Sequence, residues 1–161
     1  MIDPAIEEAI QIIRWVVLGT GVVFFLFALM VPAWDESAVI GAMLRAALRN
    51  IDYEKYRIFV GVYPNDPATQ QAVAEVAALD DRVSPVLLRD PGPTTKADCL
   101  NQVLGVIARD ETARGIRYEA IVMNDAEDLI PPLELRLFNL LIPRKDIVQL
   151  PVFPLPMKWW Q

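Results

Sequence analysis

Residues 56–79 read YRIFVGVYPNDPATQQAVAEVAAL and place a strand, a turn and a helix in immediate succession. The first eight residues are rich in β-branched and aromatic side chains, which favour strands. The segment Pro64-Asn65-Asp66-Pro67 then predicts a turn, in which Asp66 caps a helix and Pro67 takes its first position. A strand that leads through a turn into a helix is typical of parallel sheets, so this stretch predicts an α/β fold.

The same alternation continues on both sides of this segment. Further strands are predicted at residues 28–31, 83–89, 118–123 and 146–150, and further helices at residues 39–48, 96–112 and 131–141. Parallel strands need such helical crossovers between them. We therefore predict a mostly parallel sheet with helices on both faces in residues 28–161, preceded by an apolar N-terminal helix in residues 1–27.

The apolar N-terminal segment has two interpretations. Residues 15–34 carry no charged side chain, and a membrane-spanning helix needs about 20 such residues. The acidic residues that precede this stretch do not fit a cleaved signal peptide. The alternative is a core helix that ends near Phe25, followed by a buried strand at residues 28–31. Both interpretations remain open because they use the same residues.

The composition excludes several classes of function. The 161 residues carry a net charge of −6, which argues against nonspecific nucleic-acid binding, because that requires a basic surface. The chain has no histidine, so Ser-His-Asp catalysis and histidine-based zinc sites are excluded. Its single cysteine, Cys99, excludes an internal disulfide. Chemistry must therefore rest on carboxylates, lysine, arginine, backbone amides or a metal held by oxygen.

Acidic side chains gather where the predicted strands end. They are Asp35 and Glu36 after the first strand, Asp66 after the second, and Asp125, Glu127 and Asp128 after the fourth. Ligands of open parallel sheets bind beyond the carboxyl ends of the strands. The first two groups have simpler explanations, as the first turn of a helix and as a helix cap. For the third, a divalent cation would relieve the repulsion between three carboxylates, and a solvated acidic loop is the equal alternative.

Lys96 stands at the predicted start of a helix, where the helix dipole disfavours a cation. An anionic ligand would explain its position, because a helix N-terminus and a lysine together hold phosphate. A solvated surface lysine is the alternative. The glycine patterns GxGxxG and GxxxxGK[ST] do not occur in the sequence, so neither the usual dinucleotide fold nor a P-loop is supported.

Several segments resemble family 2 glycosyltransferases. They are PAWDE at 32–36, YRIFVGVYPNDPAT at 56–69, KADCLN at 96–101, and DAED at 125–128 with PPLELRLFN at 131–139. They are most similar to the bacterial inner-membrane phage adsorption protein B group, whose members carry a cytoplasmic family 2 domain on transmembrane helices. The resemblance covers residues 28–153. It implies a Rossmann-like GT-A fold that binds a nucleotide-diphosphate sugar, usually UDP-linked, with Mn²⁺ or Mg²⁺, at the bacterial inner membrane with the catalytic domain in the cytoplasm.

The resemblance also implies which residues bind the donor. The residues that match nucleotide-sugar-binding positions are Pro32, Ala33, Asp35, Asp66, Lys96, Asn101 and Asp125. After the second strand YPND replaces the family's paired aspartates, so Asp66 lies only near the base-binding position. Asp125 and Glu127 match the metal-binding DxD motif, and Asp128 is a substitute for its third position. The metal would stabilise the departing UDP as a Lewis acid.

The family pattern stops before its catalytic aspartate and its Q-x-x-R-W acceptor motif, neither of which follows in this sequence. We therefore expect the donor-binding portion of a glycosyltransferase that is inactive alone. Its expected partners are the donor, an unknown glycan or lipid acceptor and a membrane, but no nucleic acid. A non-catalytic nucleotide-binding or scaffold module of an envelope or phage-adsorption system is the alternative. A metal-dependent phosphotransfer enzyme is weaker, because no phosphate-cradling glycine loop is present.

Overall fold

The structure, a computed structural model, describes residues 24–151. Most of the predicted apolar N-terminal helix therefore lies outside the described residues. The last part of that segment is not helical, since residues 24–26 have no regular structure and Phe27 begins the first strand. No helix within residues 24–151 is both long enough and apolar enough to span a membrane.

The described chain alternates between strands and helices, as predicted. The elements are β1 (Phe27–Ala33), α2 (Ile40–Asn50), β2 (Tyr56–Val62), α3 (Pro67–Ala77), β3 (Val83–Leu87), α4 (Lys96–Arg114), β4 (Ala120–Met123), α5 (Glu134–Leu141) and a 3₁₀ helix, η1 (Ile142–Arg144). The strands form one sheet in the order β3-β2-β1-β4, and every neighbouring pair is parallel. The α/β prediction is confirmed, with a sheet that is parallel throughout.

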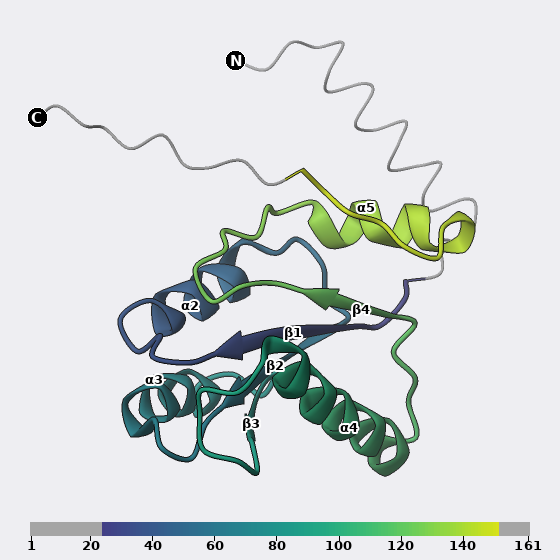
Figure 1. Ribbon diagram of the computed structural model, residues 1–161. Coiled ribbons are helices and arrows are strands. Elements are labelled where there is room, and N and C mark those ends of the chain that lie inside the picture. The colour runs from purple at the N-terminus through teal and green to yellow at the C-terminus, as the bar shows by residue number, and fades with distance from the viewer. Residues whose placement is uncertain (1–23, 152–161) are drawn as a thin grey trace, which may run out of the picture.

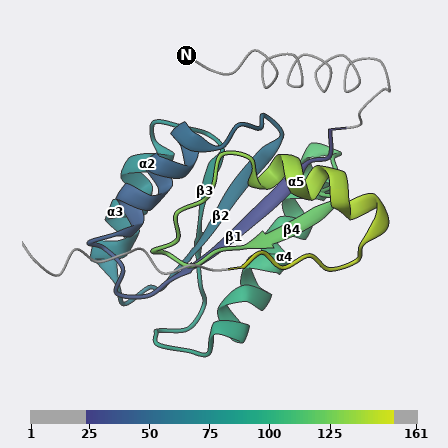
Figure 2. The ribbon, with the colours of Figure 1, turned by 90° about the horizontal axis from the view of Figure 1, so that it is seen from above.

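Helices cover both faces of the sheet, because β1 and β2 are apolar on both sides (Figures 1 and 2). Phe27, Leu29 and Val31 of β1 pack into the core formed with α2, α3 and α5. Ala28 and Met30 face the other way, into the core formed with α4. A strand buried on both faces is a continuous apolar run in the sequence, which is why the run at residues 28–31 predicts β1 correctly.

Two helix starts are capped by side chains, and the cap at Asp66 is the one that the sequence predicts. The Asp66 carboxylate accepts a hydrogen bond of 3.1 Å from the Thr69 N–H at the start of α3, and Pro67 is the first residue of that helix. The Thr95 hydroxyl accepts one of 3.1 Å from the Asp98 N–H at the start of α4. Each cap satisfies a backbone donor that the first turn of a helix leaves without a partner.

Most boundaries agree with the prediction to within two residues, but two predicted elements differ more. No strand forms at residues 146–150, where Val148 and Leu150 instead pack against the core beside α5 without joining the sheet. The helix predicted from residue 131 begins only at Glu134. The residue before a proline disfavours the helical conformation, so the consecutive Pro131 and Pro132 delay the start of α5.

The amino ends of the strands are joined to α5 by a small group of hydrogen bonds. The Tyr53 hydroxyl lies 2.7 Å from both the Phe25 carbonyl oxygen and the Asn139 Oδ1. The Phe25 N–H donates to the same Asn139 oxygen at 2.9 Å. Tyr53 precedes β2 and Asn139 lies on α5, so this group ties the residues just before β1 to two other elements.

Candidate functional site

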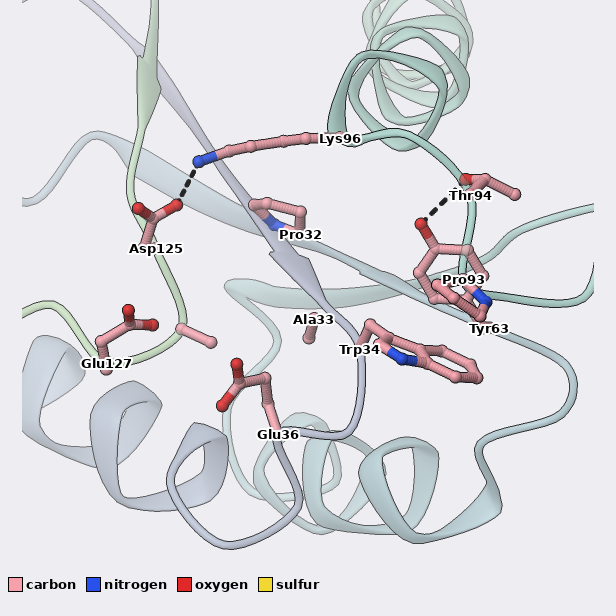
Figure 3. A pocket seen from close by; sticks show the side chains of 11 residues that line it. Pro32, Ala33, Trp34, Glu36, Tyr63, Pro93, Thr94, Lys96, Asp125 and Glu127 are labelled. Atoms are coloured by element: carbon pink, nitrogen blue, oxygen red, sulfur yellow. Dashed lines mark hydrogen bonds and ion pairs between the residues drawn. The ribbon is translucent and has the colours of Figure 1, made fainter.

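A pocket of about 280 Å³ lies at the carboxyl ends of β1 and β4 (Figure 3). Its lining residues are Pro32, Ala33, Trp34, Glu36, Tyr63, Pro93, Thr94, Lys96, Asp125, Ala126 and Glu127. This is the edge at which a parallel sheet commonly binds ligands, as the sequence predicts.

The loop after β1 is held in place by the start of α3. Asp35 has a φ of 56°, a left-handed conformation that aspartate tolerates better than most residues. Its N–H donates to the Asp66 Oδ2 at 2.7 Å, and the Glu36 N–H donates to the Thr69 Oγ1 at 3.0 Å. These bonds fix the turn that brings Glu36 to the pocket. Asp35 and Glu36 do not form the first turn of a helix, because α2 begins at Ile40.

Asp66 is a buried carboxylate that organises this loop. Burial by itself would raise the pKa of Asp66, but hydrogen bonds from Thr69 and from the Asp35 N–H outweigh it and hold the pKa below its usual value. A carboxylate that accepts several such bonds is stabilised in its charged form. Asp66 does not line the pocket; it supports the loop that does.

Carboxylates form one side of the pocket. Glu36 and Glu127 point toward the same space from different loops (Figure 3). Burial raises the pKa of Glu36, and the negative charges of Glu127 and Asp125 raise it further. Asp128 has a different role, because its Oδ2 accepts a hydrogen bond of 2.7 Å from the Asp125 N–H and closes the turn after β4. Within residues 24–151, no three acidic or thiol side chains converge as a ready-made metal site.

Lys96 crosses the pocket from the first turn of α4. Its Nζ forms an ion pair with the Asp125 Oδ1, a partner that the sequence pattern does not predict (Figure 3). The two side chains are 56% and 49% exposed. Lysine at this helix start is therefore balanced by a carboxylate of the β4 loop, and the pair stays accessible to solvent.

Aromatic side chains form the other side of the pocket. The Trp34 and Tyr63 rings meet edge to face with their centroids 5.1 Å apart, and the Tyr63 hydroxyl lies 2.9 Å from the Thr94 Oγ1. Gly92 lies tightly behind them, because a Cβ there would fall 2.4 Å from the Trp34 ring and 2.7 Å from the Tyr63 ring. Asn65 holds the Gly92 backbone with two hydrogen bonds, of 2.7 and 2.8 Å.

The structure brings together only part of the residue set that the sequence predicts. Pro32, Ala33, Lys96, Asp125 and Glu127 line the pocket. Asp35, Asp66 and Asp128 shape its loops, and Asn101 is exposed on α4 outside the lining. For all of these residues, the contacts with donor or metal that the sequence predicts stay predictions.

The lining residues absent from the predicted set are Trp34, Glu36, Tyr63, Pro93, Thr94 and Ala126. Trp34 and Glu36 stand in the quoted PAWDE segment, and Tyr63 belongs to the end of a predicted strand. Their place near strand ends could therefore have indicated that they line the pocket. Pro93 and Thr94 belong to a loop between β3 and α4, and only the folded path of that loop brings them to the pocket.

Comparison with known proteins gives consistent matches. Residues 26–153 match the family described as glycosyltransferase like family 2. The chain is 52% identical over 132 residues to the bacteriophage adsorption protein B of Escherichia coli strain K12. It has the same identity, over the same length, to the bacteriophage N4 adsorption protein B of Escherichia coli O157:H7. Each alignment covers 82% of this chain and 18% of the relative, so the chain spans less than a fifth of the relatives' length.

Proposed function

We propose that this chain, which belongs to the family described as glycosyltransferase like family 2, binds a nucleotide-diphosphate sugar in the pocket beyond β1 and β4. The family supports a glycosyltransferase role. The observation that carries the donor-site proposal is the division of the pocket into an aromatic side and a charged side (Figure 3). A nucleotide sugar is divided in the same way, with a flat base at one end and an anionic diphosphate beyond it.

The aromatic side would hold the base. Trp34 is partly exposed and braced by Tyr63, so it offers a ring held in place by its neighbours. Nucleobases stack on such rings because both surfaces are flat and polarisable. The close approach of Gly92 would keep this side in position without help from the ligand.

The charged side would hold the diphosphate. Lys96 is a compact cation of the kind that binds phosphate oxygens. Its ion pair with Asp125 is half exposed, and such pairs contribute only about 0–1 kcal/mol. Lys96 would therefore exchange the Asp125 carboxylate for a phosphate oxygen at small cost.

Asp125, Glu127 and Glu36 surround the place where a divalent cation would bind. Since no three carboxylates converge as a ready-made site within residues 24–151, phosphate oxygens of the donor would complete the set of metal ligands. Carboxylate oxygens are the ligands that Mg²⁺ and Mn²⁺ prefer, and the raised pKa of Glu36 supports the closeness of these negative groups. Asp128 would contribute by fixing the turn that carries Asp125. The bound metal would neutralise charge on the departing nucleotide diphosphate. Without it, these carboxylates would repel the anionic donor.

We propose donor binding, rather than sugar transfer, as the activity of these 161 residues alone. Transfer also needs a base for the acceptor hydroxyl, which contributes about 10²–10⁴-fold. The pocket carboxylates within the described residues are all assigned above to the metal. The sugar, the acceptor, and the location at the bacterial inner membrane with this domain in the cytoplasm stay predictions.

Calorimetric titration with UDP tests the metal part of the proposal. The full chain should bind UDP in the presence of Mn²⁺ and lose that binding in EDTA. Asp125→Asn should abolish the Mn²⁺-dependent binding, because it removes a charged oxygen donor at the centre of the charged side. Asp146→Asn, at an exposed carboxylate outside the lining, is the matched control and should bind normally. Equal affinity with and without EDTA would contradict the metal proposal.

Comparison of UDP with uridine tests the role of Lys96. Lys96→Met should weaken UDP binding by about 10- to 150-fold, because a hydrogen bond to a charged group contributes about 1.5–3 kcal/mol. It should leave uridine binding unchanged. Lys145→Met removes an exposed lysine outside the lining and should affect neither ligand. An equal loss for UDP and uridine would place Lys96 away from the diphosphate.

A further inference from the structure

One side of α5 and of the turn before it is apolar yet exposed to solvent. Leu133, Leu137 and Leu140 are 60%, 39% and 60% exposed. Their spacing of four and three residues places them along one side of the helix. The opposite side carries Leu135 and Phe138, which are buried in the core of the domain. The exposed leucines therefore lie on a separate surface that the described fold leaves uncovered.

This leucine surface ends in positive charge. Arg144 lies in η1, directly after α5, and its Nη1 lies 3.5 Å from the Leu140 carbonyl oxygen, so its guanidinium lies beside the last turn of α5. Lys145 is next in the chain and exposed, with Asp146 as its exposed acidic neighbour. Elsewhere on α5, Glu134 is buried rather than on this surface.

α5 also contacts the residues just before β1. Phe24 is 41% exposed, and the next residue, Phe25, donates its N–H to Asn139 of α5. Both lie within residues 15–34, the stretch of the sequence without a charged side chain. Among the described residues, α5 therefore contacts the segment just before β1.

We propose that α5 docks on the surface of a lipid bilayer, with Leu133, Leu137 and Leu140 at the boundary of the acyl chains and Arg144 and Lys145 against anionic headgroups. Helices with an apolar side and flanking cations lie in the membrane interface in this way. The basic residues add electrostatic attraction to anionic lipid, which salt weakens. This surface is distinct from the pocket, and the proposal does not depend on nucleotide binding.

A nitroxide on α5 tests the proposal in the full chain. Leu140→Cys provides a labelling site, whereas the native Cys99 is fully buried and stays unlabelled. Leu79→Cys, at an 85% exposed position just after α3, is the matched control. With vesicles of phosphatidylcholine and phosphatidylglycerol, the label at 140 should become several-fold more accessible to oxygen than to a water-soluble nickel complex. The control label should stay in water.

The readout is local, so anchoring by another part of the chain cannot imitate it. If both labels stay aqueous in the vesicles, the lipid proposal is wrong. Dipolar broadening of the label at position 140 that persists with vesicles would mean that a second copy of the chain covers the leucine surface. That result would also overturn the lipid proposal.

Replacing the cations tests the electrostatic part. Arg144→Gln and Lys145→Gln should each lower the ratio of docked to undocked label by about fivefold in the anionic vesicles. Neither should matter in vesicles of phosphatidylcholine alone. Arg109→Gln, at an exposed arginine on α4 across the sheet, is the control and should leave the ratio unchanged. Equal effects of all the replacements would remove the role proposed for Arg144 and Lys145.

Discussion

The two ends of the sheet use their polar side chains in opposite ways. At the carboxyl end, Asp66 and Asp128 hydrogen-bond to loop backbone, and the charged groups of Lys96 and Glu127 stay exposed around the pocket. At the amino end, polar groups are buried against one another, and burial together with the charge of Glu119 raises the pKa of Tyr53 to about 12. One end leaves its charges available to a ligand, and the other uses its polar groups to join elements.

A second, smaller pocket at the amino end supports this distinction. It has a volume of about 210 Å³ and lies between Phe24, Tyr53 and Arg136. Its cations contact groups of the same end of the sheet, since Arg136 forms an ion pair of 2.9 Å with Asp52 and donates to the Asp52 carbonyl oxygen, and Lys55 donates to the Phe24 carbonyl oxygen. Substitutions at the two ends should therefore separate stability from binding.

The largest expected effect is the loss of Asn139 at the amino end. Asn139→Leu should lower the free energy of unfolding by about 2–4 kcal/mol, because the Phe25 N–H loses its acceptor and the Tyr53 hydroxyl keeps only the Phe25 carbonyl oxygen. Urea unfolding measures this loss, and UDP binding should be unchanged wherever the variant is folded. Gln71→Leu, on the exposed side of α3, is the control. A loss of UDP binding without a loss of stability would contradict the assignment of binding to the carboxyl end of the sheet and of stability to the amino end.

Gly92→Ala should affect both stability and binding at the carboxyl end. The new methyl group would meet the Trp34 and Tyr63 rings, and such overpacking costs about 1–3 kcal/mol. Displacement of the aromatic side should also weaken UDP binding. Gly105→Ala on α4 is the matched control, because its nearest neighbour would be the end of the Arg109 side chain at 3.6 Å. If both variants bind UDP like the wild type, the aromatic side does not hold the base.

The smallest expected effect is the acid dependence of Asp66. Its pKa is lowered in the folded chain, so its contribution is present above the unfolded pKa of about 3.9 and is lost as the pH falls through the folded value. Asp66→Asn should lose about 1 kcal/mol near pH 7, because an uncharged oxygen accepts weaker hydrogen bonds. That difference from the wild type should vanish in acid. Urea midpoints measured at both pH values test this, and a difference that persists in acid would contradict it.

Much of the fold could be predicted from local sequence, for an identifiable reason. A strand buried on both faces, such as β1, gives an unbroken apolar run, and a capped helix start such as Asp66-Pro67 has its own local signature. Residues 146–150 show where local patterns fail. Their β-branched and apolar residues suit a strand, but a strand must also lie against the edge of a sheet. Here Val148 and Leu150 pack against the core instead, and only the tertiary fold decides between the two.

In the candidate site as well, local sequence reveals some residues, and tertiary packing decides the rest. Lys96, Asp125 and Glu127 could be found because their type and position at element ends are visible in the sequence. The ion pair between Lys96 and Asp125 could not, because it joins residues 29 apart through the packing of α4 against the sheet. Asp66 stands out in the sequence as an acidic residue at a strand end, but it holds a loop of the pocket instead of lining the pocket. The sequence cannot separate these two roles, because both place a carboxylate at a strand end.

The place of β1 inside the sheet has a consequence for synthesis on the ribosome. Its partner β2 follows soon after it, but β4, its other neighbour, is made much later, and the Leu26 N–H reaches the Glu119 carboxylate across 93 residues. Until then, the most apolar strand of the domain is an open edge that other chains can pair with. A nascent chain that stalls before β4 should therefore aggregate rather than form a smaller stable unit, and this protein should depend on chaperones longest while its first strand waits for its last.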